Sequence, residues 1–213
     1  MLVQIQWNIL FRIIQLYRVK EKATILYILR HGQTDWNSIG KLQGREDIDL
    51  NEFGRIQALQ IAEYFAKESF DVIVSSPLKR AYETAQIIAL KTGIPDIHIF
   101  EDLTERCWGS ASGLLPEERH SKFPNGVIPD QEEFEAMRMR GMNALVKIVQ
   151  EFEGKKIIIV SHGGIINSML YSFSQGDFGS FKTRLANACI NKIIISDSIW
   201  NVEFYNKSII ELL

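Results

Sequence analysis

The sequence predicts an α/β fold, a three-layer sandwich with a largely parallel central sheet and helices on both faces. The first observation is a set of apolar runs that are too short for typical helices and are characteristic of strands buried on both faces. The second is that these runs alternate with longer segments of helical periodicity, as in parallel sheets with crossover helices. The runs lie at 25–29, 72–74 and 157–160.

The elements of the first half follow from glycine, proline and the spacing of apolar residues. Two glycines and mixed charge predict a loop after the first strand, and an asparagine before apolar residues at helical spacing predicts a helix start. A proline after the second strand is typical of a first helical turn. The expected elements are a strand at 25–29, a loop at 38–50, a helix at 51–67, a strand at 71–75, a helix at 78–91 and a strand at 97–100.

The second half begins with an irregular stretch, residues 101–130, whose three prolines and three glycines indicate a cover over a site. Acidic residues suited to the positive end of a helix then open a long helical segment. A fully apolar strand follows, and two short runs near the end predict a hairpin. The expected elements are a helix at 131–152, a strand at 157–160, a helix ending near 173 and strands at 190–196 and 199–205.

Residues 1–22 form an apolar extension that stands apart from the domain predicted for 23–213. Their apolar residues fit both helical spacing and strand-like alternation. The polar residues Gln4, Asn8 and Arg12 interrupt the extension, so a membrane span is not expected. Three interpretations stay open: an amphipathic helix packed on the domain or on a partner, a membrane-surface anchor, or a non-native upstream segment.

Composition excludes several classes of protein. The 213 residues suit one domain, and a net charge of −2 gives no basic field for nucleic acid. Cys107 and Cys189 are far apart, so neither a disulfide framework nor a zinc site is indicated. No cluster of metal ligands is seen, and a reducing cytoplasm is the expected compartment. Oligomeric state is not indicated.

Two histidines repeat one arrangement. His31 and His162 each follow a strand of the buried type and precede a glycine. Because the carboxyl ends of parallel strands meet at one edge of a sheet, both histidines are expected to face the same crevice. Gly32 and Gly163 allow close backbone approach, and Arg30 adds a planar donor group suited to phosphate oxygens. The edge is therefore predicted to bind an anion.

Two further residues complete a possible catalytic set. Arg80 follows the second strand at the start of a helix, from where its guanidinium can reach over the crevice. Its alternative role is that of a solvated helix residue. Glu105, near Trp108, follows the third strand and could return to the same rim as a proton donor. The alternative for Glu105 is an ordinary exposed glutamate.

These residues resemble the histidine phosphatase superfamily, in its cofactor-dependent phosphoglycerate mutase-like branch. The matches run in the family order and extend over roughly residues 24–205. They are Leu29 to Thr34 with Trp36 and Asn37; Leu42 to Gly44 with Asp47 and Leu50; Gly54 with Gln57 and Ala58; Ser76 to Leu78 with Arg80, Ala81, Thr84 and Ala85; Leu103 with Glu105 and Gly109; and Val160 to Gly164.

The resemblance implies a phosphohistidine mechanism. His31 would attack phosphorus, Glu105 would protonate the leaving oxygen, and the chemistry would need neither metal nor cofactor. The implied ligands of the phosphoryl oxygens are Arg30, Asn37, Arg80, His162 and Gly163. The acceptor that orients the second ring nitrogen of His31 is not indicated.

The substrate is less defined than the chemistry. Mutases of this branch carry a long insertion with an Arg-Arg pair between the glutamate and the second histidine. Here only 56 residues separate Glu105 from His162, without that pair, so a phosphatase acting on a small phosphorylated metabolite is expected. A phosphoglycerate mutase and a phosphate-recognising regulatory module without turnover are the alternatives. A serine esterase using Ser161 lacks the expected Gly-x-Ser-x-Gly turn. The candidates for specificity are Trp36, Lys41, Gln43, Arg106 and Trp108.

Overall fold

The computed structural model describes residues 22–213. The extension predicted for residues 1–22 therefore lies, apart from Lys22, outside the described residues. No helix between residues 22 and 213 is both long enough and apolar enough to traverse a membrane.

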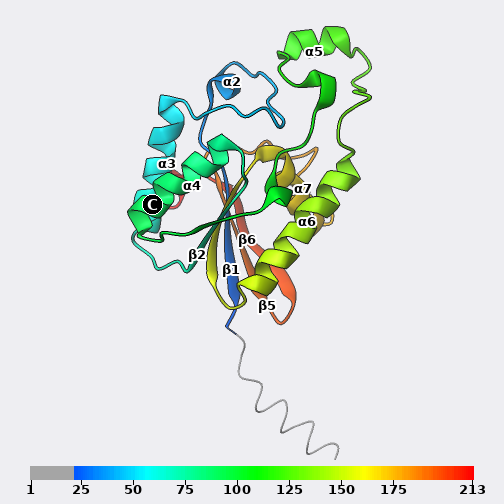
Figure 1. Cartoon of the computed structure of the whole chain (residues 1–213). Coiled ribbons are helices and arrows are strands. Elements are labelled where there is room, and N and C mark those ends of the chain that lie inside the picture. Colours follow the sequence, from blue (N-terminus) through cyan, green and yellow to red (C-terminus); the bar gives the residue numbers. More distant parts are fainter. Residues whose placement is uncertain (1–21) are drawn as a thin grey trace, which may run out of the picture.

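Six strands form one sheet in the order β3-β2-β4-β1-β5-β6 (Figure 1). β1 to β4 run parallel to one another, and the antiparallel hairpin of β5 and β6 extends the sheet beside β1. The predicted α/β class with a largely parallel sheet is confirmed. The strands are β1 Thr24–Arg30, β2 Val72–Ser75, β3 Ile97–Ile99, β4 Lys156–Ser161, β5 Ile190–Ser196 and β6 Ile199–Lys207.

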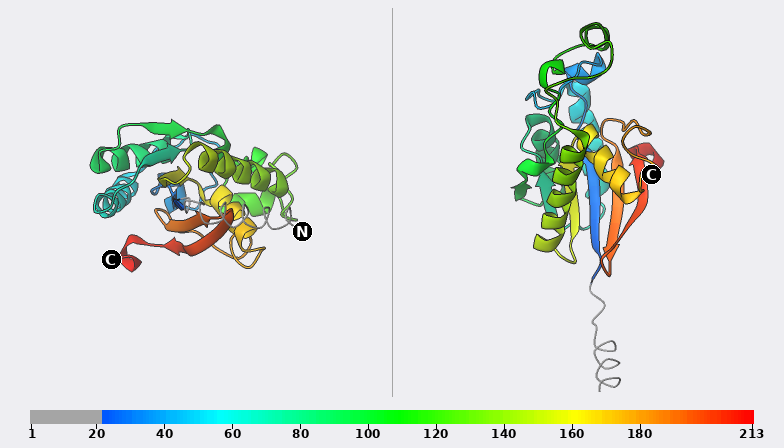
Figure 2. Two further views of the ribbon diagram at one scale, coloured as in Figure 1. Left: turned by 90° about the horizontal axis from the view of Figure 1, so that it is seen from below. Right: turned by 90° about the vertical axis from the view of Figure 1, so that its right-hand side faces the viewer.

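Helices cover both faces of this sheet (Figure 2, left). α3 and α4 pack on one face, and α6 and α7 pack on the other. The helices are α2 Asp35–Ser38, α3 Glu52–Phe65, α4 Lys79–Thr92, α5 Pro116–Lys122, α6 Phe134–Glu151 and α7 Gly163–Phe173, with single 3₁₀ turns at Glu101–Leu103, Gly109–Ala111 and Ile209–Glu211.

The strand sequences explain the two cores. Side chains alternate between the faces of a strand, so Leu26 and Ile28 of β1 belong to the core beneath α6 and α7. Tyr27 and Leu29 belong to the core beneath α3 and α4. β4 follows the same rule with its isoleucines. Both faces are apolar because both are covered, which is why the central strands appear in the sequence as uninterrupted apolar runs.

The carboxyl ends of β1, β2 and β4 meet at one edge. Arg30 is in register with Ser161, and Ser75 is in register with Val160. The ladder continues one residue further, because the His31 N–H donates to the carbonyl of Ser161 at 3.0 Å. The residues that follow the three strands therefore start side by side, with α2 and α5 above this edge in Figure 1.

Candidate active site

His31 is the centre of the edge and is almost completely buried, with 2% of its surface exposed. Its Nδ1 lies 2.7 Å from the carbonyl oxygen of Gly32, and Nε2 accepts a hydrogen bond of 3.2 Å from Nε of Arg80. Since a carbonyl oxygen can only accept, the proton of the neutral ring sits on Nδ1 and the lone pair sits on Nε2. The Gly32 carbonyl is thus the orienting acceptor that the sequence did not indicate.

The charge state of His31 favours a nucleophile. Burial of the ring, together with the nearby guanidinium groups of Arg80 and Arg30, holds its pKa well below the usual histidine value of 6.5. The ring is therefore neutral at pH 7. A buried, oriented and unprotonated imidazole has the form that attack on phosphorus requires.

Arg80, the second residue of α4, is held by two backbone carbonyls. Its Nη1 and Nη2 donate to the carbonyls of Glu46 and Gly44, each at 2.7 Å. Burial lowers the pKa of Arg80 to about 10, which still leaves the guanidinium charged at pH 7. The alternative of a solvated helix residue is wrong, because Arg80 is 1% exposed.

His162 lies beside His31, with 5.2 Å between the ring centroids. Its Nε2 is 2.7 Å from the hydroxyl of Ser76, and that hydroxyl also accepts from the N–H of Leu78 at 3.3 Å. The Ser76 hydroxyl keeps its own proton for Nε2, and with that proton donated the His162 ring carries its proton on Nδ1. This Nδ1 is buried and has no partner among the described residues, so it can donate to a ligand.

Arg30 presents a second buried nitrogen of this kind. Its Nη1 donates to the carbonyl of Leu185 at 2.7 Å, whereas its Nε is buried without a partner in residues 22–213. A Cβ added to Gly163 would lie 3.3 Å from that Nε. The absence of a side chain at residue 163 therefore allows the guanidinium to pack closely against the start of α7.

Glu105 lies at the N-terminus of α7. Its carboxylate accepts the N–H of Gly164 at 2.9 Å and the N–H of Ile165 at 3.1 Å. The N–H of Arg106 is a third donor, at 2.8 Å. The positive end of a helix attracts a negative charge, and these three bonds fix the carboxylate at the rim of the site. Glu105 is thus a site residue and not an ordinary exposed glutamate.

Asn37 reaches the same site from α2. Its side-chain oxygen accepts the N–H of Thr34 at 3.2 Å, which closes a capping box, and accepts from the amide of Asn187 at 3.0 Å. Since its oxygen is already used, its amide nitrogen is available as a donor. The amide of Asn187 also bridges to the carbonyls of His31 and Gly32, at 3.3 and 3.4 Å.

These groups surround a cavity of about 190 Å³. Arg30, His31, Asn37, Arg80 and Glu105 line it, as do the specificity candidates Lys41, Gln43 and Trp108. His162 is completely buried and is not part of the cavity wall, and Gly163 begins α7 directly after it. The structure thus brings the predicted catalytic set together.

Two of the specificity candidates lie elsewhere. The ring of Trp36 packs beneath the ammonium of Lys41, with 4.3 Å from nitrogen to ring centroid, and is not part of the cavity wall. Arg106 lines a larger neighbouring cavity, stacked 4.5 Å from the ring of Trp108.

Sequence reasoning also missed Arg184 and Asn187, which line the catalytic cavity. Both lie in a segment between α7 and β5 for which no regular pattern predicted an element. Among residues 22–213, no group of three or more histidine, cysteine or acidic side chains is arranged to hold a metal ion.

Comparison with known proteins agrees with this geometry. Residues 26–208 match the family model of the histidine phosphatase superfamily, branch 1. The chain is 40% identical over 183 residues to the uncharacterized phosphatase PhoE of Bacillus subtilis, with 86% of this chain and 94% of that protein aligned. It is 35% identical over 202 residues to a metal-independent phosphoserine phosphatase of Arabidopsis thaliana, with 89% and 84% aligned.

A solved structure shows the same fold. A phosphoserine phosphatase variant of Entamoeba histolytica, in complex with phosphoserine, superimposes with a TM-score of 0.77 at 30% identity. The alignment covers 89% of this chain and 100% of that one. The chain belongs to the histidine phosphatase superfamily. Within that family it is a phosphatase for small molecules, because both the geometry of its site and its relatives with phosphatase names support this activity.

Proposed function

We propose that this phosphatase hydrolyses the phosphomonoester of a small metabolite through a phosphoryl group carried transiently on Nε2 of His31. The observation that supports this best is the pair of buried nitrogens without partners in the described chain, Nε of Arg30 and Nδ1 of His162. Buried polar atoms normally form hydrogen bonds. Both nitrogens belong to residues next to His31, and the oxygens of a bound phosphoryl group would satisfy them.

In the first step, Nε2 of His31 forms a bond to phosphorus while the bond from phosphorus to the ester oxygen breaks. Glu105 enters this step in its protonated form and gives that proton to the ester oxygen, so an alcohol leaves. Arg30, Arg80 and His162 bind the phosphoryl oxygens and stabilise the charge of the transition state. The Asn37 amide and the backbone N–H of Gly163 add further donors.

In the second step, water attacks phosphorus and the bond to Nε2 breaks. Glu105 takes the proton of the water, and phosphate leaves. His31 and Glu105 return to their starting states, so the cycle consumes only ester and water. The neutral state of His31, with its lone pair on Nε2, supports the first step and is restored by the second.

A mutase is not favoured, because the relatives at 40% and 35% identity carry phosphatase names. A regulatory module without turnover would need neither a nucleophile nor a proton donor. We also propose small phosphorylated metabolites as the substrate class, since a relative and a structural neighbour are named for phosphoserine, a small phosphomonoester.

We place the catalytic domain in residues 23–213 and the protein in a reducing cytoplasm. The family match over residues 26–208 supports the first proposal, and the free thiols of Cys107 and Cys189 support the second. Lys41, Gln43 and Trp108 are the proposed contacts to the leaving group at the catalytic cavity.

The test is release of phosphate from p-nitrophenyl phosphate in the presence of EDTA. The native chain should be active, and His31→Ala should be inactive while it retains the native circular dichroism spectrum. Activity of His31→Ala equal to that of the native chain would overturn the mechanism. Conversion of 3-phosphoglycerate to its isomer with 2,3-bisphosphoglycerate present, faster than hydrolysis, would identify a mutase instead.

A further inference from the structure

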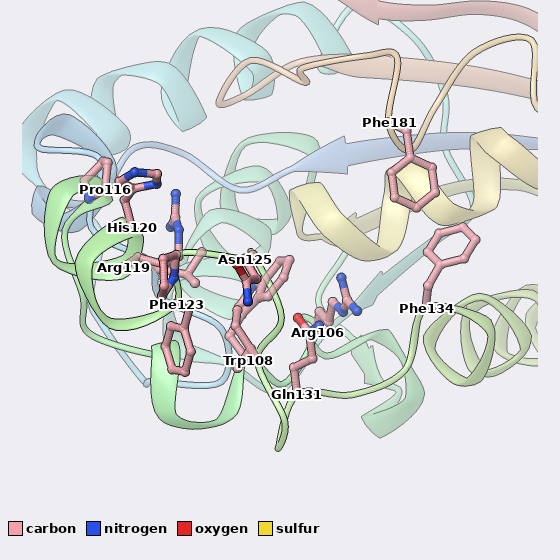
Figure 3. Close-up of a pocket in the computed structure, with 14 residues that line it drawn as sticks. Arg106, Trp108, Pro116, Arg119, His120, Phe123, Asn125, Gln131, Phe134 and Phe181 are labelled. Atoms are coloured by element: carbon pink, nitrogen blue, oxygen red, sulfur yellow. The ribbon is translucent and has the colours of Figure 1, made fainter.

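A second, larger cavity adjoins the catalytic one. Pro116, Arg119 and His120 of α5 form one side of it (Figure 3). Its volume is about 920 Å³, and the two cavities share Leu42 and Trp108. Pockets for organic ligands typically measure about 300–1,000 Å³, so the catalytic cavity suits a phosphoryl group and the adjoining atoms of a leaving group. The remainder of a substrate must therefore pass Trp108 into the larger cavity.

The wall of the larger cavity carries positive charge. Arg106 and Arg119 line it, and neither belongs to an ion pair within residues 22–213. Among the described lining residues there is no aspartate or glutamate. Two unpaired guanidinium groups without a carboxylate in the wall favour a negatively charged ligand.

The acidic groups near Arg106 include Glu132 and Glu133, and neither lines the larger cavity. Glu132 lies behind Arg106, whose Nε donates to its carbonyl at 2.8 Å. The Glu132 carboxylate accepts two hydrogen bonds from Arg140, at 2.9 and 3.0 Å. Among the described residues that line the catalytic cavity, Glu105 is the one with an acidic side chain. Its carboxylate already accepts hydrogen bonds from three backbone N–H groups. A substrate ammonium thus meets cations in the wall of the larger cavity and no carboxylate there.

Four aromatic side chains also line the larger cavity: Trp108, Phe123, Phe134 and Phe181. Figure 3 shows Arg119 on one side, Phe134 and Phe181 on the opposite side, and Arg106 with Trp108 between them. The rings of Phe134 and Phe181 are 4.9 Å apart. Phe181 is 81% exposed and has a φ of 70°, a left-handed conformation that is strained for an aromatic residue. Strain of this kind concentrates at sites that hold ligands.

We propose that the larger cavity binds the leaving group of the substrate. It favours phosphate esters whose leaving group carries an aromatic or apolar body and a second anionic group, and it disfavours leaving groups that carry an ammonium. This inference rests on the proposed function. It separates the chain from relatives named for phosphoserine, because Arg106 or Arg119 can pair with the carboxylate of phosphoserine whereas its ammonium group finds no carboxylate in the wall.

The first test compares three phenyl phosphates that differ at the para position: carboxymethyl, 2-hydroxyethyl and 2-aminoethyl. We expect kcat/KM to be about tenfold higher for the anionic ester than for the neutral one, as a charge-assisted contact provides, and lowest for the ammonium ester. Hydrolysis of all three at equal kcat/KM, or fastest for the ammonium ester, would overturn the inference and leave the proposed function intact. Failure to hydrolyse any of them would instead contradict the proposed function.

The second test assigns the preference to Arg119. Arg119→Gln should lower kcat/KM for the carboxymethyl ester about tenfold and leave the neutral ester nearly unchanged. Lys122→Gln is the matched control, because it removes the same charge from the same helix outside the cavity wall. Equal losses for both esters in Arg119→Gln, or the same loss in Lys122→Gln, would contradict a contact between Arg119 and the substrate anion.

The third test uses phosphoserine and its deamino analogue, 3-phosphooxypropionate, which differ only by the amino group. The deamino compound should have the higher kcat/KM. A preference for phosphoserine would overturn the exclusion of ammonium groups.

Discussion

The position of Glu105 can be tested by a single methyl group, through Gly164→Ala. A Cβ at residue 164 would lie 2.5 Å from Oε1 of Glu105, whereas ordinary contact begins near 3.4 Å. The carboxylate must therefore withdraw by about 0.9 Å, a misplacement of the size that costs about 10²-fold in rate. It also loses its bonds to the N–H groups of Gly164 and Ile165. Alanine is the better helix former by roughly 0.5–1 kcal/mol, so the fold should persist.

The assay is phosphate release from two substrates with different leaving groups. Glycerol 2-phosphate must expel an alkoxide and needs a proton, whereas p-nitrophenolate leaves without one. Gly164→Ala should therefore reduce kcat/KM for the glycerol ester about 10²-fold and affect kcat/KM for p-nitrophenyl phosphate far less, because kcat/KM reports the first step and not the hydrolysis of phosphohistidine that both substrates share. In a Glu105→Gln background, Gly164→Ala should cause little further loss. Equal losses for the two substrates, or additive losses in the double variant, would refute Glu105 as the displaced proton donor.

Three further predictions follow from buried or strained groups. Arg80→Ala should lower kcat/KM about 10²–10³-fold. It should also destabilise the fold by about 1–3 kcal/mol, because the carbonyls of Gly44 and Glu46 lose their donors. An unchanged free energy of unfolding in urea would contradict the predicted destabilisation. Since the pKa of His31 is held below 6.5, the unfolded chain binds a proton in mild acid that the folded chain does not. The free energy of unfolding should thus fall as the pH drops below about 6.5. His31→Gln should reduce the slope of this free energy against pH by up to about 1.4 kcal/mol per pH unit. Equal slopes for the native chain and His31→Gln, in urea titrations at several pH values, would show that His31 is not the group responsible. Phe181→Gly should raise the free energy of unfolding by about 1 kcal/mol, because glycine adopts the left-handed backbone conformation of residue 181 without strain. The same substitution should lower kcat/KM for aryl esters. A lower melting temperature would contradict the first expectation and show that contact with Phe134 outweighs the strain.

Much of the sheet and the catalytic set could be predicted because both depend on short-range patterns. The apolar run of β1 is buried on both faces, which indicates a central strand of a parallel sheet. The residues that follow it therefore lie where the carboxyl ends of the parallel strands meet. The parallel pairing of β1 with β4 then placed His31 beside His162. The boundary of α6 was less exact. The helix begins at Phe134 and not at residue 131, because Glu132 turns back to bind Arg140 and the N–H of Cys107.

The remaining parts of the site have no local signature. The Gly32 carbonyl that orients His31 is a backbone atom, and any residue supplies one. Arg184 and Asn187 lie in an irregular segment whose path depends on left-handed residues such as Phe181 and Ala188. The larger cavity is formed by side chains from separate loops and from α5, α6 and the segment after α7. Such a surface exists only once the chain has folded.

The central claim is that Nε2 of His31 carries the phosphoryl group. The direct measurement is acid-free rapid quenching of a single turnover, followed by mass spectrometry of the peptides. The account predicts one added phosphoryl group on the peptide that contains His31, lost on mild acid treatment, and greater accumulation in Glu105→Gln with p-nitrophenyl phosphate, because water activation is then slowed. A phosphoryl group on another residue would contradict this claim. Turnover by the native chain would also contradict it if no phosphorylated peptide were found at any quench time, in the native chain or in Glu105→Gln.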